Sequence, residues 1–266
     1  MKTRIVSAII VLALFIPLLI VGGFPFQLGI TLISLIGLKE FMDIKGTKKE
    51  LPAFIRFIAY IVVVIIMLSS IGQTKLYFSL DYRLLSGLFI CFLLPTVIYH
   101  DREKYSINDG FYLIGGVLFL SISLSLIILL RNTSLYLTIY LFLITIMTDT
   151  YAYFTGLLLG RHKLLESISP KKTWEGMIGG TFFGTLIPVV FYHIMVSQAT
   201  PIFNIVIVTL FLSILGQFGD LIFSCIKRYF GKKDFSNIMP GHGGVLDRLD
   251  SIIFVMLGFV FFISMI

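Results

Sequence analysis

The chain has 266 residues, of which 58% are hydrophobic and 13% charged, and its formal net charge is +7. Soluble domains carry about 25% charged residues, so this composition excludes an ordinary water-soluble protein. The lysines and arginines lie in short segments between apolar runs, where they set membrane topology and meet anionic lipid head groups. The positive charge therefore does not indicate nucleic-acid binding. The apolar runs are continuous rather than alternating, which favours transmembrane helices over a barrel.

Nine apolar runs predict an all-α fold, a polytopic helical membrane protein with about nine transmembrane helices in a single domain over residues 1–266. The runs cover about residues 5–21, 24–43, 54–71, 84–99, 111–130, 135–159, 174–196, 203–228 and 249–266. The first run follows Lys2 and Arg4 as in a signal peptide, but no small-residue cleavage site follows it, so we interpret it as a span. Cys91 and Cys225 lie in or at the end of apolar runs and are expected to stay unpaired.

The basic residues gather on one side when the connections between the runs alternate across the membrane. That side holds the N-terminus and the segments 45–53, 100–110, 160–173 and 229–248, whereas the other side holds Lys75, Arg83 and Arg131. The positive-inside rule places the basic side in the cytoplasm. We therefore expect a cytoplasmic N-terminus, an outside C-terminus and a bacterial-type inner-membrane location.

The run at 135–159 carries a carboxylate, Asp149, within an otherwise apolar helix. Such a group is costly unless it is paired or faces water, so it is a functional candidate by default. Tyr153 follows four residues later and lies on the same helical face. The alternative is a structural hydrogen bond between helices.

The segment before the seventh run combines two lysines with residues that begin helices. Either Ser169 and the following proline start the helix, or Thr173 caps it with Glu175 in its first turn. Lys171 and Lys172 are either topology signals or a phosphate-binding pair at a helix N-terminus, where side chains and helix dipole act together.

The most informative stretch is the polar segment from Ser224 to Asp250, SCIKRYFGKKDFSNIMPGHGGVLDRLD. Its glycine-rich centre, 240–244, can bring several N–H groups close to one anion. Cations, amides and metal-binding carboxylates together suit the handling of a nucleoside triphosphate. The charged residues of the segment are Lys227, Arg228, Lys232, Lys233, Asp234, Asp247, Arg248 and Asp250.

Carboxylates from two runs are expected to meet at the membrane surface. Asp220, Ser224 and Lys227 fall on one face of the eighth run at 100° per residue. Asp247 and Asp250 share a face at the start of the ninth. If the two helices are neighbours, as their short connection suggests, the three carboxylates converge. This favours a divalent-cation site over a structural ion-pair cluster.

Two blocks of the chain resemble the signature of phosphatidate cytidylyltransferases, also called CDP-diacylglycerol synthases. The first block runs from Ser224 to Asp250 and matches nearly every fixed position of the family pattern. The second comprises Asp149-Thr-x-Ala-Tyr153, two following glycines, and Ser169 to Gly176. The length and the nine-run layout fit as well. Departures from the family pattern, none of which removes a charged residue from the core site, lie at Tyr151, Leu157 and Met239.

The resemblance implies that CTP and phosphatidic acid react to give CDP-diacylglycerol and pyrophosphate. It implies Mg²⁺ held by Asp220 and Asp247, with Asp250 and Ser224 beside them, and it allows a second cation. The lipid phosphate is already a good nucleophile, so catalysis consists of in-line positioning and charge neutralisation. The implied partners are CTP, phosphatidic acid and membrane lipids, without nucleic acid, and the family suggests a homodimer.

The reaction gives the remaining polar residues candidate roles. Residues 1–134 become a scaffold, and 135–266 become the catalytic helices, with cytoplasmic loops at 160–173 and 229–248. His242 is a candidate to protonate or orient the leaving pyrophosphate, and its alternative is a purely structural role in the loop. Asp234 is expected to orient either Lys233 or the ligands of the metal ion. The candidate phosphate clamps are Lys227, Arg228, Lys233 and Arg248, and the candidate backbone donors are Gly241, Gly243 and Gly244. The other candidate substrate-binding residues are Asp149, Tyr153, Ser169, Lys171, Lys172, Thr173 and Glu175.

Two other functions stay open. A CTP-dependent polyprenol-type lipid kinase would release CDP instead of pyrophosphate. An ion-coupled transporter would account for intramembrane carboxylates such as Asp149 and Asp220. Transporters usually show internal repeats and helices broken at mid-membrane, whereas the charge here gathers at one surface.

Overall fold

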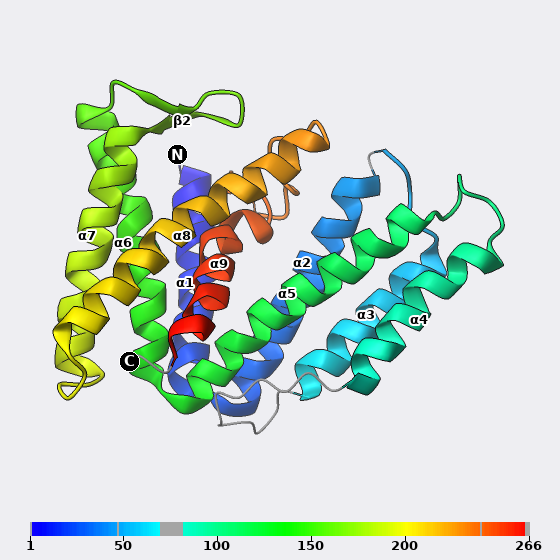
Figure 1. Ribbon diagram of the computed structural model, residues 1–266, viewed down its shortest axis with the longest axis horizontal. Helices are drawn as coiled ribbons and strands as arrows, with labels where there is room; N and C mark the ends of the chain where they lie inside the picture. Colours follow the sequence, from blue (N-terminus) through cyan, green and yellow to red (C-terminus); the bar gives the residue numbers. More distant parts are fainter. Residues whose placement is uncertain (1, 47, 70–81, 240, 264–266) are drawn as a thin grey trace. The chain divides into compact units, whose positions relative to one another are not determined.

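The computed structural model describes residues 2–46, 48–69, 82–239 and 241–263, with side chains from residue 9 onward. These residues fold almost entirely into α-helices, which confirms the predicted all-α class (Figure 1). The elements are α1 (Lys2–Val21), α2 (Gly23–Gly46), α3 (Ala53–Ser69), α4 (Tyr82–Ile98), α5 (Ile107–Thr133), α6 (Leu135–Leu159), β1 (Lys163–Leu165), β2 (Ser169–Thr173), α7 (Trp174–Met195), α8 (Ile202–Tyr229) and α9 (Leu246–Phe262).

Each predicted apolar run overlaps one of these helices, although several helices extend a few residues beyond the run. Of the described helices, α2, α5, α6, α7 and α8 are long and apolar enough to cross a membrane. The apolar parts of α1, α3 and α4 are shorter, and α9 has 17 residues with charged residues in its first turns. The helix positions thus agree with the sequence, while nine spans and the orientation of the termini stay predictions. Lys75 and Pro240 lie outside the described residues.

The chain divides into two compact units, which are described separately. The first unit comprises Met1–Asn132 and Asp234–Asp247, and the second comprises Thr133–Lys233 and Arg248–Ile266. The glycine-rich segment and the first residues of α9 therefore belong to the first unit. The rest of α9 belongs to the second unit, together with α6, α7, α8 and the hairpin.

In the first unit, α2 packs against α1 and α3, and α3 packs against α4. Fully buried apolar side chains such as Leu38, Met42 and Ile55 fill the contacts of α2 and α3. Burial of a Leu or Ile side chain contributes about 1.5–3 kcal/mol where the surrounding medium is water. Inside a bilayer this driving force between helices is absent, so close packing and polar contacts decide which helices associate.

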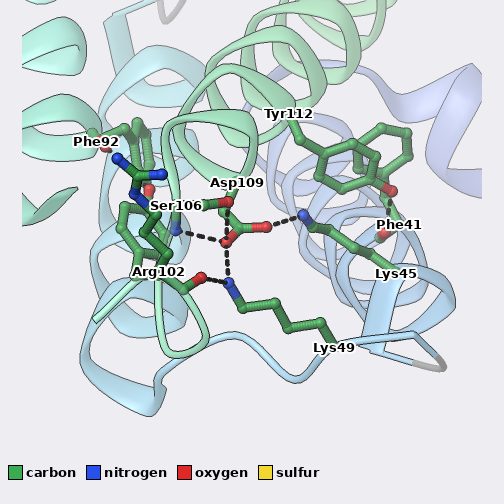
Figure 2. A network of polar contacts seen from close by, with 9 residues as sticks. Phe41, Lys45, Lys49, Phe92, Arg102, Ser106, Asp109 and Tyr112 are labelled. Carbon is green, nitrogen blue, oxygen red and sulfur yellow. Dashed lines mark hydrogen bonds and ion pairs between the residues drawn. The ribbon is translucent and has the colours of Figure 1, made fainter. Parts of the chain in front are cut away.

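One polar contact ties α5 to the end of α2, and Figure 2 shows it in detail. Asp109, in the first turn of α5, accepts hydrogen bonds from the backbone N–H and the hydroxyl of Ser106. Its carboxylate also pairs with Lys45 and, at 2.7 Å, with Lys49. Lys49 in turn donates to the carbonyl oxygen of Arg102 at 2.6 Å. Two cations and two further hydrogen-bond donors thus offset the cost of burying the Asp109 carboxylate.

In the second unit, α6 lies along α7, and α8 packs against both (Figure 1). Small residues permit this approach: a side chain at Gly180 would place its Cβ 2.7 Å from the Cβ of Ala152. Hydroxyl pairs join α6 to α8, with Thr148 and Ser213 oxygens 2.7 Å apart. Cys91 and Cys225 are unpaired, as expected.

Between α6 and α7 the chain forms a short antiparallel hairpin that the sequence did not suggest. Strand β1 pairs with β2 in the register Lys163 to Thr173 and Leu165 to Ser169. Helix α7 begins directly after it, and the hydroxyl of Thr173 accepts from the N–H of Gly176 at 3.1 Å. Of the two predicted helix starts, the Thr173 cap is therefore confirmed, and Ser169 lies in a strand.

Candidate active site

The second unit brings together two sequence blocks that lie about fifty residues apart. Lys172, at the end of β2, pairs with the carboxylate of Asp220 in α8 at 2.7 Å. The same ammonium group lies 3.4 Å from the carbonyl oxygen of Gln217. On the other side of Asp220, Ser224 donates to the carboxylate at 3.4 Å. The helical face predicted for Asp220 and Ser224 is therefore present, and a lysine from the hairpin completes it.

Three carboxylates from three helices gather near this ion pair. Asp149 of α6 and Asp250 of α9 each interact electrostatically with Asp220 and with one another. Helices α8 and α9 are neighbours here, because a Cβ at Gly219 would lie 2.8 Å from the carbonyl oxygen of Asp250. Lys227 is only 8% exposed, and its positive charge interacts with the carboxylate of Asp250. Close like charges disfavour one another unless a cation lies among them.

The candidate phosphate clamps differ in their surroundings. Arg228 is exposed and donates to the carbonyl oxygens of Ile168, at 3.3 Å, and Lys232, at 3.0 Å. It therefore links the hairpin turn to the segment that follows α8. Lys233 and Arg248 are exposed. Exposed cations can reach an approaching anion, whereas the buried Lys227 interacts electrostatically with Asp250.

Glu175, which belongs to the family-like block that ends at Gly176, stabilises the hairpin. Glu175 accepts from the backbone N–H groups of Arg161 and His162 and contacts His162 Nδ1 at 2.6 Å. Its carboxylate is thus occupied in closing the base of the hairpin. Tyr153 is 65% exposed on α6, and Lys171 is exposed on β2. The half-buried Ser169 lies at the start of β2. Roles in substrate binding stay predictions for all of these residues.

In the first unit the glycine-rich segment folds around a carboxylate. Asp247 Oδ2 accepts from the N–H groups of Phe235 and Gly244, both at 2.9 Å. Gly243 has a φ of +86°, and a Cβ there would lie 2.8 Å from Asp247 Oδ2, so glycine is required. The N–H groups of His242 and Gly243 both donate to Met239 O.

These bonds engage two of the three glycine amides that the sequence suggested as phosphate donors. Either amide would have to exchange its present acceptor for a phosphate oxygen. Gly241, with a φ of +79°, is exposed, as is Asp234 at the start of the segment. The described residues on either side of position 240 therefore bond to Met239 O and to Asp247.

Besides Asp109, sequence analysis missed a second buried carboxylate of the first unit, Glu40. Glu40 of α2 is 1% exposed and accepts from Ser236 Oγ at 2.6 Å and from the N–H groups of Val245 and Leu246, both at 2.8 Å. The signal was present, because Glu40 lies inside the apolar run 24–43, just as Asp149 lies inside the sixth run.

The side chains include the type of oxygen ligand that Mg²⁺ uses, but the described residues do not form a metal cage. Among the described residues, no group of three or more His, Cys, Asp or Glu side chains is close enough to hold a metal ion. Mg²⁺ usually takes one or two protein carboxylates, with waters and substrate phosphates as its other ligands. Asp220 and Asp250, with the hydroxyl of Ser224, offer this kind of oxygen set. Asp247 belongs to the first unit, and its meeting with Asp220 stays a prediction.

Comparison with known proteins covers nearly the whole chain. The model of the cytidylyltransferase family matches residues 2–266. The chain is 37% identical over 257 residues to a phosphatidate cytidylyltransferase of Staphylococcus haemolyticus and 34% identical over 261 residues to one of Staphylococcus aureus. Each alignment covers 96% of this chain and 96% of the relative. The chain therefore belongs to the cytidylyltransferase family.

Proposed function

We propose that the protein transfers the cytidylyl group of CTP to phosphatidic acid and releases pyrophosphate. The observation that carries this proposal is the convergence of Asp149, Asp220 and Asp250 with Lys172 and Lys227 in the second unit. Carboxylates beside cations suit a reaction between two phosphate-bearing substrates. Relatives over 96% of the chain carry the name of this activity.

In the proposed reaction an oxygen of the lipid phosphate attacks the α-phosphorus of CTP. A new P–O bond forms while the bond between the α-phosphorus and the bridging oxygen breaks, and pyrophosphate leaves with the electron pair. The lipid phosphate is already ionised, so no side chain has to remove a proton. The exposed cations Arg228, Lys233 and Arg248 are the candidates for neutralising the phosphates.

Mg²⁺, when bound, supplies further charge neutralisation at the α-phosphate and the leaving pyrophosphate. We assign Asp220, Asp250 and Ser224 to hold it, and the sequence motif adds Asp247. Lys172 now neutralises Asp220. If Asp220 held the cation, Lys172 would be available to bind a phosphate oxygen of the substrate. The hairpin lysine would then serve two partners, Asp220 and the substrate.

The proposal includes a location. The basic loops predicted from the sequence support a reaction at the cytoplasmic surface of the inner membrane, where CTP and the lipid head group would meet. The expected assembly is a homodimer, which rests on the family resemblance. A second cation is compatible with the carboxylate-rich surroundings.

The position of a radioactive label in CTP tests the reaction. Purified protein is incubated with Mg²⁺, with either phosphatidic acid or a polyprenol, and with CTP that is labelled at either the α- or the γ-phosphate. We expect the α-label to enter the lipid and the γ-label to appear in pyrophosphate. Entry of the γ-label into a polyprenol, with release of CDP, would identify a lipid kinase instead. Ion-coupled flux without any consumption of CTP would identify a transporter.

A further inference from the structure

The start of α9 is held by a carboxylate from a distant helix. Glu40 lies 206 positions before Leu246 and yet accepts the N–H group of Leu246 at 2.8 Å. A second oxygen of Glu40 accepts from Val245 N at 2.8 Å and from Ser236 Oγ at 2.6 Å. The side chain is 1% exposed, so these three donors replace its contacts with water.

The location of these donors explains why a charged acceptor fits. Val245 and Leu246 lie at the N-terminus of α9, where the first N–H groups have no acceptor within the helix. The helix dipole also favours a negative charge at this end. Helices usually obtain such a cap from a residue next to their own start. In this protein α2 provides the cap, so the start of α9 is fixed to another helix of the first unit.

Gly244 connects this cap with Asp247. Its N–H donates to Asp247 Oδ2 at 2.9 Å, while a Cβ at Gly244 would lie 2.6 Å from Glu40 Oε1. The carboxylates of Glu40 and Asp247 therefore both lie close to the backbone of Gly244. Because Asp247 Oδ2 accepts two N–H groups of this segment, the position of the segment sets the direction of Oδ1.

We propose that Glu40 is a positioning residue, which fixes the start of α9 and thereby the orientation in which Asp247 presents its carboxylate to a divalent cation. The functional consequence rests on the proposed cytidylyl transfer, in which Asp247 is a metal ligand. The geometric part stands on the contacts of the first unit alone. Changing an outer partner that orients a metal ligand typically costs about 10–100-fold in metal affinity or activity.

The test compares Glu40→Gln with Glu50→Gln, which removes the same charge from an exposed side chain. In Glu40→Gln one carboxylate oxygen becomes an NH₂ group, which cannot accept a backbone N–H. Three quantities are measured on the full-length protein in detergent. They are the affinity for Mn²⁺ from the electron paramagnetic resonance of free Mn²⁺, the hydrogen exchange of the peptide covering 241–250, and the steady-state constants for CTP and phosphatidic acid.

We expect Glu40→Gln to weaken Mn²⁺ binding and lower kcat by about 10–100-fold, with faster exchange over 241–250 and an unchanged KM for phosphatidic acid. Glu40→Asp, which keeps the charge, should recover part of the loss. Mn²⁺ affinity and kcat per folded molecule equal to those of Glu50→Gln would overturn the proposal. If the wild type lacks transfer activity, the proposed function fails, while Mn²⁺ affinity and exchange still decide the role of Glu40.

A second variant covers the case in which Glu40→Gln does not fold. Ser236→Ala removes one of the three donors to Glu40 and leaves the carboxylate in place. We expect the same changes in Mn²⁺ affinity and exchange, but smaller. An affinity equal to that of the wild type in Ser236→Ala would then overturn the proposal.

Discussion

Lys172 and Lys171 are neighbours in sequence, but their surroundings differ. Lys172 pairs with Asp220 at 2.7 Å, whereas Lys171 is exposed on β2. Alternate residues of a strand point to opposite faces, so only one of the two side chains can face α8. The sequence left open whether the two lysines are topology signals or a phosphate-binding pair, and it did not distinguish them, because it held no sign of the strand β2 that contains both.

Replacing the two lysines singly tests this difference. We expect Lys172→Ala to lower kcat/KM for CTP by about 10–100-fold, since a hydrogen bond to a charged group contributes about 1.5–3 kcal/mol. Lys171→Ala should have the smaller effect, and Lys172→Arg should recover part of the activity. Equal losses in Lys171→Ala and Lys172→Ala, measured as initial rates against CTP concentration, would contradict the assignment. Lys75→Ala, on the predicted outer side, should be silent.

At the scale of elements, nine apolar runs were enough to predict the nine helices of the described residues, with ends within a few residues. Their uninterrupted hydrophobicity is a strong signal. The hairpin was missed because β1 has three residues and β2 has five, and neither strand shows an apolar alternation. The partners of Glu40 and Asp109 were missed because they come from distant segments, which one sequence does not reveal.

The contact between α5 and α2 predicts a loss of stability. Asp109→Asn leaves the buried Lys45 and its neighbour Lys49 without a carboxylate, and removing one partner of a buried pair costs about 3–5 kcal/mol. Asp101→Asn is the matched control, because Asp101 and Lys104 form an exposed pair at 4.0 Å that is worth about 0–1 kcal/mol. Unfolding in a titration with dodecyl sulfate measures both. Equal stability of the two variants would contradict the expected role of Asp109.

The cap of α7 gives a second prediction at this scale. Thr173→Ala removes the acceptor of the Gly176 N–H, and loss of such a cap costs about 0.5–2 kcal/mol. The thermal midpoint should fall in Thr173→Ala and return in Thr173→Ser, which keeps the hydroxyl. A midpoint that falls equally in both variants would assign the effect to packing of the methyl group instead.

At the scale of the whole molecule, the predicted topology places the two ends of α8 on opposite sides of the membrane. The helix has 28 residues, which at 1.5 Å per residue is long enough to cross a bilayer. Gln198 and Lys232 are exposed near its two ends. In a cysteine-free background, a membrane-impermeant maleimide added to intact cells should label Gln198→Cys and spare Lys232→Cys. The reverse pattern would contradict the orientation derived from the basic loops.

Some residues of the candidate site could be identified from the sequence, whereas others could be identified only from the structure. The carboxylates and cations of the 224–250 segment could be identified from the sequence, because their spacing forms a dense and specific motif. That Asp149 and Lys172 lie beside Asp220 depends on the packing of α6 and the hairpin against α8, which only the three-dimensional structure provides. The buried Glu40 belongs to the same class, since its partners lie about 200 residues away.

The central claim is that carboxylates of the second unit support transfer of the cytidylyl group to a lipid phosphate. The partly exposed pair of Asp220 with Lys172 contributes about 0–1 kcal/mol to stability, so Asp220→Asn should fold like the wild type. The most direct measurement follows α-labelled CTP into phosphatidic acid by wild type, Asp220→Asn and Asp247→Asn at equal folded concentration. We expect labelled CDP-diacylglycerol from the wild type and at least about 100-fold less from either variant. Wild-type rates from either folded variant would contradict the central claim.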